Sequence, residues 1–287
     1  MVILLIVFTI IIVFFLIVMW IDCHRFVVQE YTVTSDKIKK DAKILLLSDL
    51  HNKSFGKNNE KLINAIDKQN PDAIIIAGDM YTACKGQRND TACDFVCKIA
   101  EKYPVYYGNG NHEHKTRIAP EEYGFVYEQY VKKIKQSGVV VLVNENVFLE
   151  EYGIQIFGVE IDRKFYQKFT CPAMEDTYLN KMLGRPKAAN YNLLIAHNPD
   201  YFKDYAKWGA DLIVSGHVHG GLMRLPVLGG FISPRLCLFP HYDGGLFEEG
   251  SSTMILSRGL GTHTLPIRIF NPGELVVLHM KRSGKVD

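Results

Sequence analysis

The residues with the clearest capacity for chemistry are carboxylates, imidazoles and one amide that follow short apolar runs. Five runs are followed closely by such side chains, namely Asp49 and His51, Asp79, Asn111 and His112, His197, and His217 and His219. A ligand set of this kind, without a thiolate, suits Mn²⁺, Fe or Zn²⁺. The sequence therefore predicts a metal site assembled from the ends of several strands.

Spacing adds to this interpretation. Asp49 and His51 are two residues apart, and an extended backbone would project both to one side. The same holds for His217 and His219. Each string alone is weak, since a lone Gly-Asp is usually a turn and His197 alone would more often be a hydrogen-bonded core histidine. All five together, in this order, favour a shared site.

The elements that must position these residues are short apolar runs alternating with helical stretches. The expected strands cover residues 26–34, 43–48, 73–77, 104–107, 139–143, 154–159, 191–196, 211–215, 253–257 and 274–279, and the expected helices lie near 58–69, 90–102, 120–137 and 198–207. This alternation predicts an α/β domain whose sheets are covered on both faces. Open α/β sheets bind ligands outside the carboxyl ends of their strands, so five strand ends can converge on one crevice.

These motifs carry a resemblance over about residues 40–280. The series Asp49-x-His51, Gly78-Asp79, Gly110-Asn111-His112-Glu113, His197 and Gly216-His217-x-His219 is similar to that of the calcineurin-like metallophosphoesterase superfamily. The apolar start, the double glycine at 220–221 and the tail motifs at 257–261 and 265–268 resemble its membrane-associated bacterial branch, the YkuE/YaeI-like phosphodiesterases. That branch often has Gln where this chain has Leu222.

The resemblance implies a four-layer α/β/β/α sandwich with two divalent metal ions. It assigns one metal to Asp49, His51, Asp79 and His219, and the other to Asp79, Asn111, His197 and His217. Two such cations would activate a shared water and neutralise phosphoryl charge. His112 is expected to be catalytic rather than a ligand, stabilising charge or protonating the leaving oxygen. Glu113 either orients His112 or is simply solvated.

The start of the chain predicts a membrane anchor. Residues 1–21 carry no charged side chain, which corresponds to about 30 Å of helix, and Trp20 stands where an interfacial aromatic belongs. A cleavable signal peptide would need a basic start and small residues at the junction, and this run ends in Met19, Trp20 and Ile21. We expect an uncleaved anchor over residues 1–22 and a catalytic domain over 26–287.

Lysines and arginines follow the anchor and none precedes it, so the domain is expected in the cytoplasm. The net charge of +2 gives no case for a nucleic-acid partner. Six cysteines fit reduced thiols at least as well as a disulfide framework. Cys93 and Cys97 lack a second pair that would complete a zinc site, so they are expected to be small buried side chains.

The segment from Leu222 to Phe247 is rich in Leu, Phe, Pro and Gly. It is either a loop packed over the sheets or an apolar lid for lipid chains, with Arg224 and Arg235 available to phosphate. The leading hypothesis is hydrolysis of a phosphodiester or pyrophosphate bond in a lipid-linked substrate, such as a nucleotide-activated glycolipid. The alternatives are an enzyme acting on soluble nucleotides and a non-catalytic membrane scaffold, which would have no need for the full ligand set.

Overall fold

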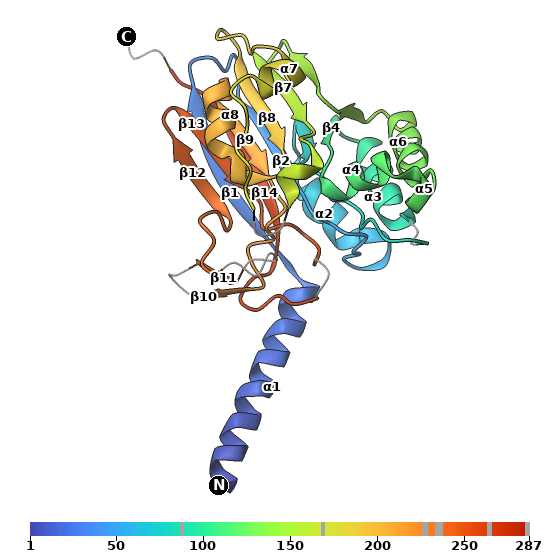
Figure 1. Cartoon of the computed structure of the whole chain (residues 1–287), viewed down its shortest axis with the longest axis vertical. Coiled ribbons are helices and arrows are strands. Elements are labelled where there is room, and N and C mark those ends of the chain that lie inside the picture. The colour runs from blue at the N-terminus through green and yellow to red at the C-terminus, as the bar shows by residue number, and fades with distance from the viewer. Residues whose placement is uncertain (87–88, 168–169, 226–228, 233–237, 263–265, 285–287) are drawn as a thin grey trace.

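Two six-stranded sheets pack face to face, and an N-terminal helix stands away from them (Figure 1). A computed structural model describes all residues except 87–88, 168–169, 226–228, 233–237, 263–265 and 285–287. The first sheet has the order β1 (Phe26–Ser35), β14 (Gly273–Arg282), β2 (Ala42–Leu47), β3 (Ala73–Ile76), β4 (Val105–Gly108) and β5 (Val140–Leu142). Because β2 to β5 are parallel, their carboxyl ends share one edge.

The second sheet has the order β12 (Gly245–Glu249), β13 (Ser252–Leu256), β9 (Leu212–Ser215), β8 (Tyr191–Ala196), β7 (Ile154–Val159) and β6 (Glu145–Leu149). The four central strands are parallel, and β12 and β6 run antiparallel at the two edges. A separate hairpin pairs β10 (Met223–Leu225) with β11 (Gly229–Ile232).

Helices cover the outer face of each sheet. Over the first sheet lie α2 (Glu60–Gln69), α3 (Asp90–Ala100), α4 (Asn111–Ile118), α5 (Pro120–Tyr123) and α6 (Val126–Gln136). Over the second lie α7 (Tyr178–Leu183) and α8 (Phe202–Trp208). Three short 3₁₀ helices cover Lys57–Asn59, Arg163–Tyr166 and Pro199–Tyr201.

Strand β2 shows why the apolar runs are continuous. Its Ile44 and Leu46 face the second sheet, whereas Leu45 and Leu47 face the helices, and all four are buried. Both faces of the strand are covered, so neither needs polar residues. The four-layer α/β/β/α architecture that the family resemblance implied is confirmed.

Several elements differ from the expectation. The helix expected over 120–137 is two helices separated near Gly124, whose φ of +69° ends α5. Helix α4, which begins at Asn111, was not expected, and neither were α7, the edge strands β6 and β12, or the β10–β11 hairpin. The edge strands have one partly exposed face and therefore lack the continuous apolar runs on which the prediction relied.

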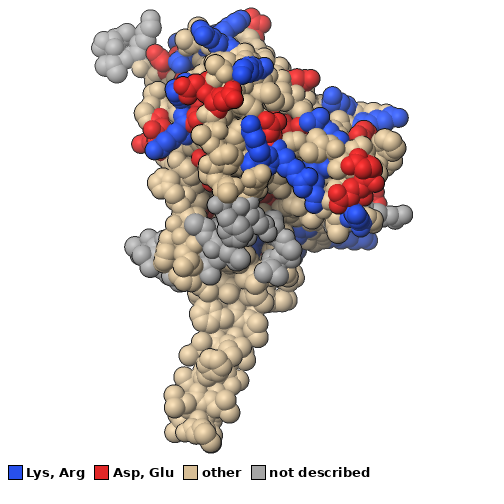
Figure 2. All heavy atoms as spheres, viewed as in Figure 1, with Lys and Arg blue, Asp and Glu red and all other residues tan. Residues whose placement is uncertain are grey.

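Helix α1 (Val2–His24) is long and apolar enough to cross a membrane. Figure 2 shows its stalk free of charged side chains on the visible face, in contrast to the charged surface of the domain above it. At its carboxyl end Asp22 and Cys23 are buried against the domain. The helix therefore ends inside the folded domain and has no intervening linker.

Candidate metal centre

The predicted ligands converge where the carboxyl ends of both sheets meet. Asp49 and His51 follow β2, Asp79 follows β3, and Asn111 and His112 follow β4. From the second sheet, His197 follows β8, and His217 and His219 follow β9. Potential ligand atoms lie within 4.8 Å of one another in each of three groups, Asp49–His51–His219, His51–Asp79–His112 and Asp79–His197–His217.

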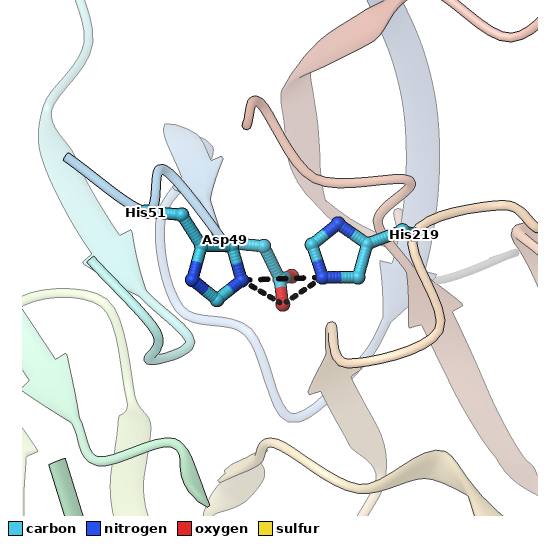
Figure 3. A group of neighbouring side chains, drawn as sticks. All are labelled: Asp49, His51 and His219. Carbon is cyan, nitrogen blue, oxygen red and sulfur yellow. Dashed lines mark hydrogen bonds and ion pairs between the residues drawn. The ribbon is translucent and has the colours of Figure 1, made fainter. Parts of the chain in front are cut away.

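Asp49 is buried at the centre of the first group (Figure 3). Its Oδ1 lies 3.4 Å from His219 Nε2 and 3.9 Å from His51 Nε2. The carboxylate also accepts hydrogen bonds from the backbone N–H of His217, at 3.1 Å, and from Ser48 Oγ. Burial raises the pKa of Asp49 to about 6, against the opposing effect of the nearby histidine His197.

Asp79 uses its two oxygens differently. Oδ1 accepts the backbone N–H of His112 at 2.8 Å. Oδ2 lies 3.1 Å from His197 Nε2 and 4.0 Å from His51 Nε2, so it faces histidines of two of the groups. Burial opposes ionisation, but the surrounding imidazoles, His197 first among them, hold the pKa of Asp79 well below its usual value. Oδ2 is therefore the oxygen with the geometry to serve two cations.

The orientation of His197 fits a cation ligand. Its Nδ1 lies 2.5 Å from the Ala77 carbonyl oxygen and must donate to it, which leaves the lone pair on Nε2 directed at Asp79. Burial alone would lower the pKa of His197, but the carboxylates of Asp79 and Asp49 outweigh it and raise the value to about 10. The position therefore favours positive charge, and a metal ion can supply that charge in place of the proton.

Two further observations fit metal binding. The Nε2 atoms of His51 and His219 approach to 3.2 Å, an arrangement in which two neutral lone pairs would repel. The Oδ1 atom of Asn111 is buried and has no hydrogen-bond partner in the described part of the chain. Buried polar atoms are normally satisfied, so an unpaired amide oxygen next to these groups is the expected state of a ligand awaiting its cation.

His112 differs from His197 in the direction of its hydrogen bond. Its Nδ1 accepts the backbone N–H of Ala83 at 2.8 Å, so the ring proton must lie on Nε2. Nε2 lies 3.9 Å from Asp79 Oδ2. Burial lowers the pKa of His112, which favours the neutral ring. Distance alone would allow His112 to bind a metal, but a protonated Nε2 has no lone pair to offer and acts as a donor.

The backbone of the site is unusual. Positive φ angles between +51° and +74° occur at Asp49, His51, Asp79, His217 and His219. The expectation that each two-residue pair lies on extended chain is therefore wrong. The side chains converge because the chain turns through left-handed residues, and non-glycine residues in that region store strain that tends to mark functional sites. Gly216 permits this packing, since a Cβ there would overlap Ser48 Oγ and Asp49 Oδ2.

Glu113 has neither of the roles expected from sequence. Its buried carboxylate accepts the backbone N–H groups of Asp79 and Met80 at 2.8 and 2.9 Å, that of Gly110 at 3.0 Å, and the Tyr107 hydroxyl at 2.7 Å. It therefore holds the Asp79 turn against the start of α4 and does not bond to the His112 ring. The buried position of Glu113 could not be inferred from its residue type.

The C-terminal segment supplies a support that sequence reasoning did not assign. Arg268 is almost fully buried and donates to the carbonyl groups of Gly261, Arg258, Gly259 and Asn271. The loop that it holds touches the first metal motif, because the N–H of Gly261 donates to the Asp49 carbonyl at 2.6 Å. The only signal in the sequence was the tail motif that contains Arg268.

A cleft of about 680 Å³ opens beside the site and is lined by Asn111, His112, His114, Lys115, Ile118, Arg163, Lys164, Tyr166 and Gln167. Its wall carries three basic residues and no carboxylate. Another cavity of about 550 Å³ lies between α7 and α8, and none of the predicted ligands lines it. Of these two cavities, the first is the one that His112 lines.

Comparison with known proteins identifies this arrangement. Residues 42–221, more than half of the chain, match the family Calcineurin-like phosphoesterase. The chain belongs to the calcineurin-like phosphoesterases. The matched range contains every predicted ligand, and the superfamily resemblance derived from the motifs is confirmed.

Curated relatives of the chain are named as metallophosphoesterases. The metallophosphoesterase YkuE of Bacillus subtilis is 24% identical over 282 residues, which cover 92% of this chain and 89% of YkuE. Cj0846 of Campylobacter jejuni is 29% identical, over 88% of this chain but 63% of its own length. A zebrafish protein named for a transmembrane segment and a metallophosphoesterase domain is 23% identical, over 84% of this chain and 53% of its own length. The chain thus spans less than two thirds of the last two.

The likeness of this phosphoesterase to solved structures is lower. The NAD nucleotidase NadN of Haemophilus influenzae is 14% identical, with a TM-score of 0.46 over 77% of this chain and 45% of that one. That likeness is too low to carry an inference about substrate.

The segment from Leu222 to Phe247 forms the β10–β11 hairpin and the approach to β12, near the junction with α1 (Figure 1). Arg224, expected to be available to phosphate, instead pairs with Asp243 at 3.3 Å and donates to its carbonyl at 2.9 Å. Arg235 lies outside the described residues. Arg224 is therefore part of the loop's own structure.

Proposed function

We propose that the protein is a two-metal phosphoesterase that hydrolyses a phosphodiester or pyrophosphate bond in a lipid-linked substrate. One divalent cation would be held by Asp49, His51, Asp79 and His219, and the other by Asp79, Asn111, His197 and His217, with Mn²⁺, Fe or Zn²⁺ as the candidates. The observation that carries the proposal is Oδ2 of Asp79, which faces His197 on one side and His51 on the other.

When bound, the cations would supply an activated water and neutralise charge on the phosphoryl oxygens. The protein's own side chains position the metal ligands and donate a hydrogen bond to the substrate. The Nε2 proton of His112 lies beside Asp79 and can hydrogen-bond a phosphoryl or leaving oxygen as negative charge builds up there. Because the ring is already neutral, His112 acts as a hydrogen-bond donor and keeps this proton. Glu113 keeps the Asp79 turn in place while this occurs.

The cleft next to His112 supports a substrate with more than one anionic group. Lys115, Arg163 and Lys164 line it, and Arg163 makes no ion pair with any residue in the described ranges. A diphosphate would place one phosphorus at the metal centre and a second phosphate near these cations. Ile118 adds apolar surface at the same wall.

The membrane tether favours a lipid-linked substrate over a soluble nucleotide. We take residues 1–22 as a retained anchor and residues 26–287 as the catalytic domain, which faces the cytoplasm. Retention is supported by contacts at the junction, where buried Asp22 accepts the backbone N–H of Asn271 at 3.0 Å and the Cys23 thiol donates to the Pro266 carbonyl at 3.3 Å. Cleavage after Ile21 or Asp22 would disrupt contacts of the folded domain.

The test is a substrate panel with the full-length protein in vesicles, with Mn²⁺ added. Turnover of lipid-linked diphosphates with high kcat/KM, well above that of chromogenic diesters and soluble nucleotides, is the expected result. Preference for the soluble nucleotides would replace the lipid-linked substrate by the alternative enzyme. Absence of turnover with every substrate and metal would favour a non-catalytic scaffold.

A further inference from the structure

Phe270 packs beside the middle of α1 and not at its end. Its ring centroid lies 6.4 Å from that of Phe14 and 6.2 Å from that of Phe15. Phe14 is ten residues before the end of the helix at His24, which corresponds to about 15 Å along the axis. Phe270 nevertheless keeps 40% of its surface exposed. A loop of the domain therefore extends along α1 toward the N-terminus of that helix.

The level of this loop on the helix is fixed by polar contacts. The backbone N–H of Asn271 donates to Asp22 Oδ2, and the Cys23 thiol donates to the Pro266 carbonyl. The buried guanidinium of Arg268 also stabilises this loop, because it donates hydrogen bonds to the carbonyl groups of Gly261 and Asn271. The contact of Phe270 with Phe14 and Phe15 is thus built into the fold.

Two more apolar side chains lie on neighbouring segments. Ile269 exchanges backbone hydrogen bonds with Leu222 and Arg224, next to the hairpin that carries Phe231. Phe231 meets Phe239 edge to face, with ring centroids 5.2 Å apart. Leu238 and Phe239 are 60% and 55% exposed. Figure 1 places this hairpin at the base of the domain, where α1 enters. We call Leu238, Phe239 and Phe270 the basal patch.

We propose that the basal patch is inserted into the membrane, with acyl chains of the bilayer as its occupant. The proposal rests on the retained anchor of the proposed function. If α1 crosses the hydrocarbon layer, Phe14 and Phe15 lie about 10 Å beyond Ile21. The Phe270 ring contacts both, with centroids 6.4 and 6.2 Å from theirs. That depth matches the insertion of interfacial elements, about 5–10 Å. Phe239 and Phe270 also have positive φ, an unusual conformation for bulky residues.

Insertion would hold the metal centre against the bilayer surface. The side-chain amide of Asn271, next to Phe270, donates to the carbonyl groups of His219 and Gly221, both at 2.8 Å. The motif that contains His219 is therefore linked through one residue to both the inserted loop and Asp22. A phosphate at headgroup level would reach this motif without leaving the membrane, whereas a soluble substrate would gain nothing from the arrangement.

Tryptophan fluorescence tests the insertion directly. The full chain has two tryptophans, Trp20 and Trp208, and both are replaced by Phe before Phe270→Trp is introduced. The matched control is Phe148→Trp in the same background, because Phe148 is 39% exposed and packs near Lys39, beyond the far end of β1. A third protein keeps Trp20 alone and reports whether α1 is in the membrane.

In vesicles of lipid brominated near the top of the acyl chain, tryptophan at 270 should lose roughly half or more of its emission and resist aqueous acrylamide. Tryptophan at 148 should keep its emission in brominated lipid and be quenched by acrylamide. If 270 behaves like 148 while Trp20 is quenched, the insertion is wrong. If 270 resists both quenchers, protein such as a second copy of the chain covers the patch, and the proposal is equally overturned.

Activity separates this proposal from the proposed function. Phe270→Ser should lower turnover of a lipid-linked substrate in vesicles on the order of tenfold, the scale of losing one partly buried aromatic ring, and leave a soluble chromogenic diester unchanged. An equal loss on both substrates would contradict a membrane role. Lipid quenching at 270 without any phosphoesterase activity would refute the proposed function and leave the insertion standing.

Discussion

Asp79 and His197 face each other through Oδ2 and Nε2 at 3.1 Å in an interior closed to water. Nδ1 of His197 is already committed to the Ala77 carbonyl, so a lone pair on Nε2 points at the carboxylate. The two atoms repel unless a positive charge lies between or beside them. A proton can fill that role, and so can a divalent cation, which makes this pair the most direct structural argument for a metal.

Replacing Asp79 by Ala should remove bound metal and lower kcat by about 10³-fold or more, equivalent to about 4 kcal/mol, because one residue serves both proposed sites. Elemental analysis and steady-state kinetics measure the two effects. Asp176→Ala is the matched control, since Asp176 is exposed and pairs with Lys207 at the surface. Full turnover in the presence of a strong chelator would refute the two-metal interpretation.

His112→Asn should keep both metals and lose about 10²–10³-fold in kcat, the usual contribution of one hydrogen-bond donor to developing charge. The reason is the Nε2 proton that the Ala83 N–H enforces. Metal content decides the outcome. A variant that loses metal would make His112 a ligand and reverse its assignment.

Arg163→Ala should raise KM for a substrate with two phosphates about fivefold and leave kcat on a simple diester unchanged. Arg163 lines the cleft beside His112 and has no competing carboxylate there. Lys181→Ala, at an exposed ion pair with Glu175, serves as the control. Equal KM values for the variant and the parent would remove the second phosphate from the proposed substrate.

Replacing Arg268 by Met should lower the free energy of unfolding by about 3 kcal/mol or more, because several buried carbonyl groups would lose their donor at about 1–3 kcal/mol each. Metal affinity should fall with it, since the loop contacts Asp49 through Gly261. Thermal unfolding and metal titration test both effects. Arg282→Met, at an exposed position on β14, should change neither.

A maleimide that cannot cross membranes should label a protein with Cys84 as its only cysteine after permeabilisation of cells and not before, if the domain is cytoplasmic. Cys84 is exposed. A protein with only Cys93 is the negative control, because Cys93 is buried, and burial by itself raises the pKa of this thiol and keeps it protonated. Efficient labelling of Cys84 in intact cells would place the domain outside.

The sequence predicted which strand ends carry the clustered side chains better than it predicted the backbone between them. Apolar runs ending before Asp49, Asp79, Asn111, His197 and His217 correspond to β2, β3, β4, β8 and β9, because strands buried on both faces leave a clear signal. The left-handed turns that orient these side chains have no signal in the sequence, since Asp and His rarely adopt this conformation without tertiary support. The edge strands were missed for the opposite reason, because half-exposed strands resemble loops in composition.

Contacts between distant segments were also beyond sequence reasoning. From the sequence, Glu113 is expected to be an exposed acidic residue, whereas in the fold its carboxylate accepts three backbone N–H groups. The link from Asp22 through Asn271 to the His219 carbonyl joins the two ends of the chain, and no local pattern encodes it. Such contacts depend on which segments the fold brings together.

The position of β14 in the first sheet has a consequence for how the protein is made. β14 lies between β1 and β2, so the strand next to the anchor has no partner until residues 273–282 have emerged from the ribosome. During translation β1 would wait at the membrane with unpaired backbone groups, and β2 would present an open edge of its own. Closure of this sheet therefore waits for β14, and a nascent chain that stalls before Gly273 would present both edges to chaperones or to aggregation.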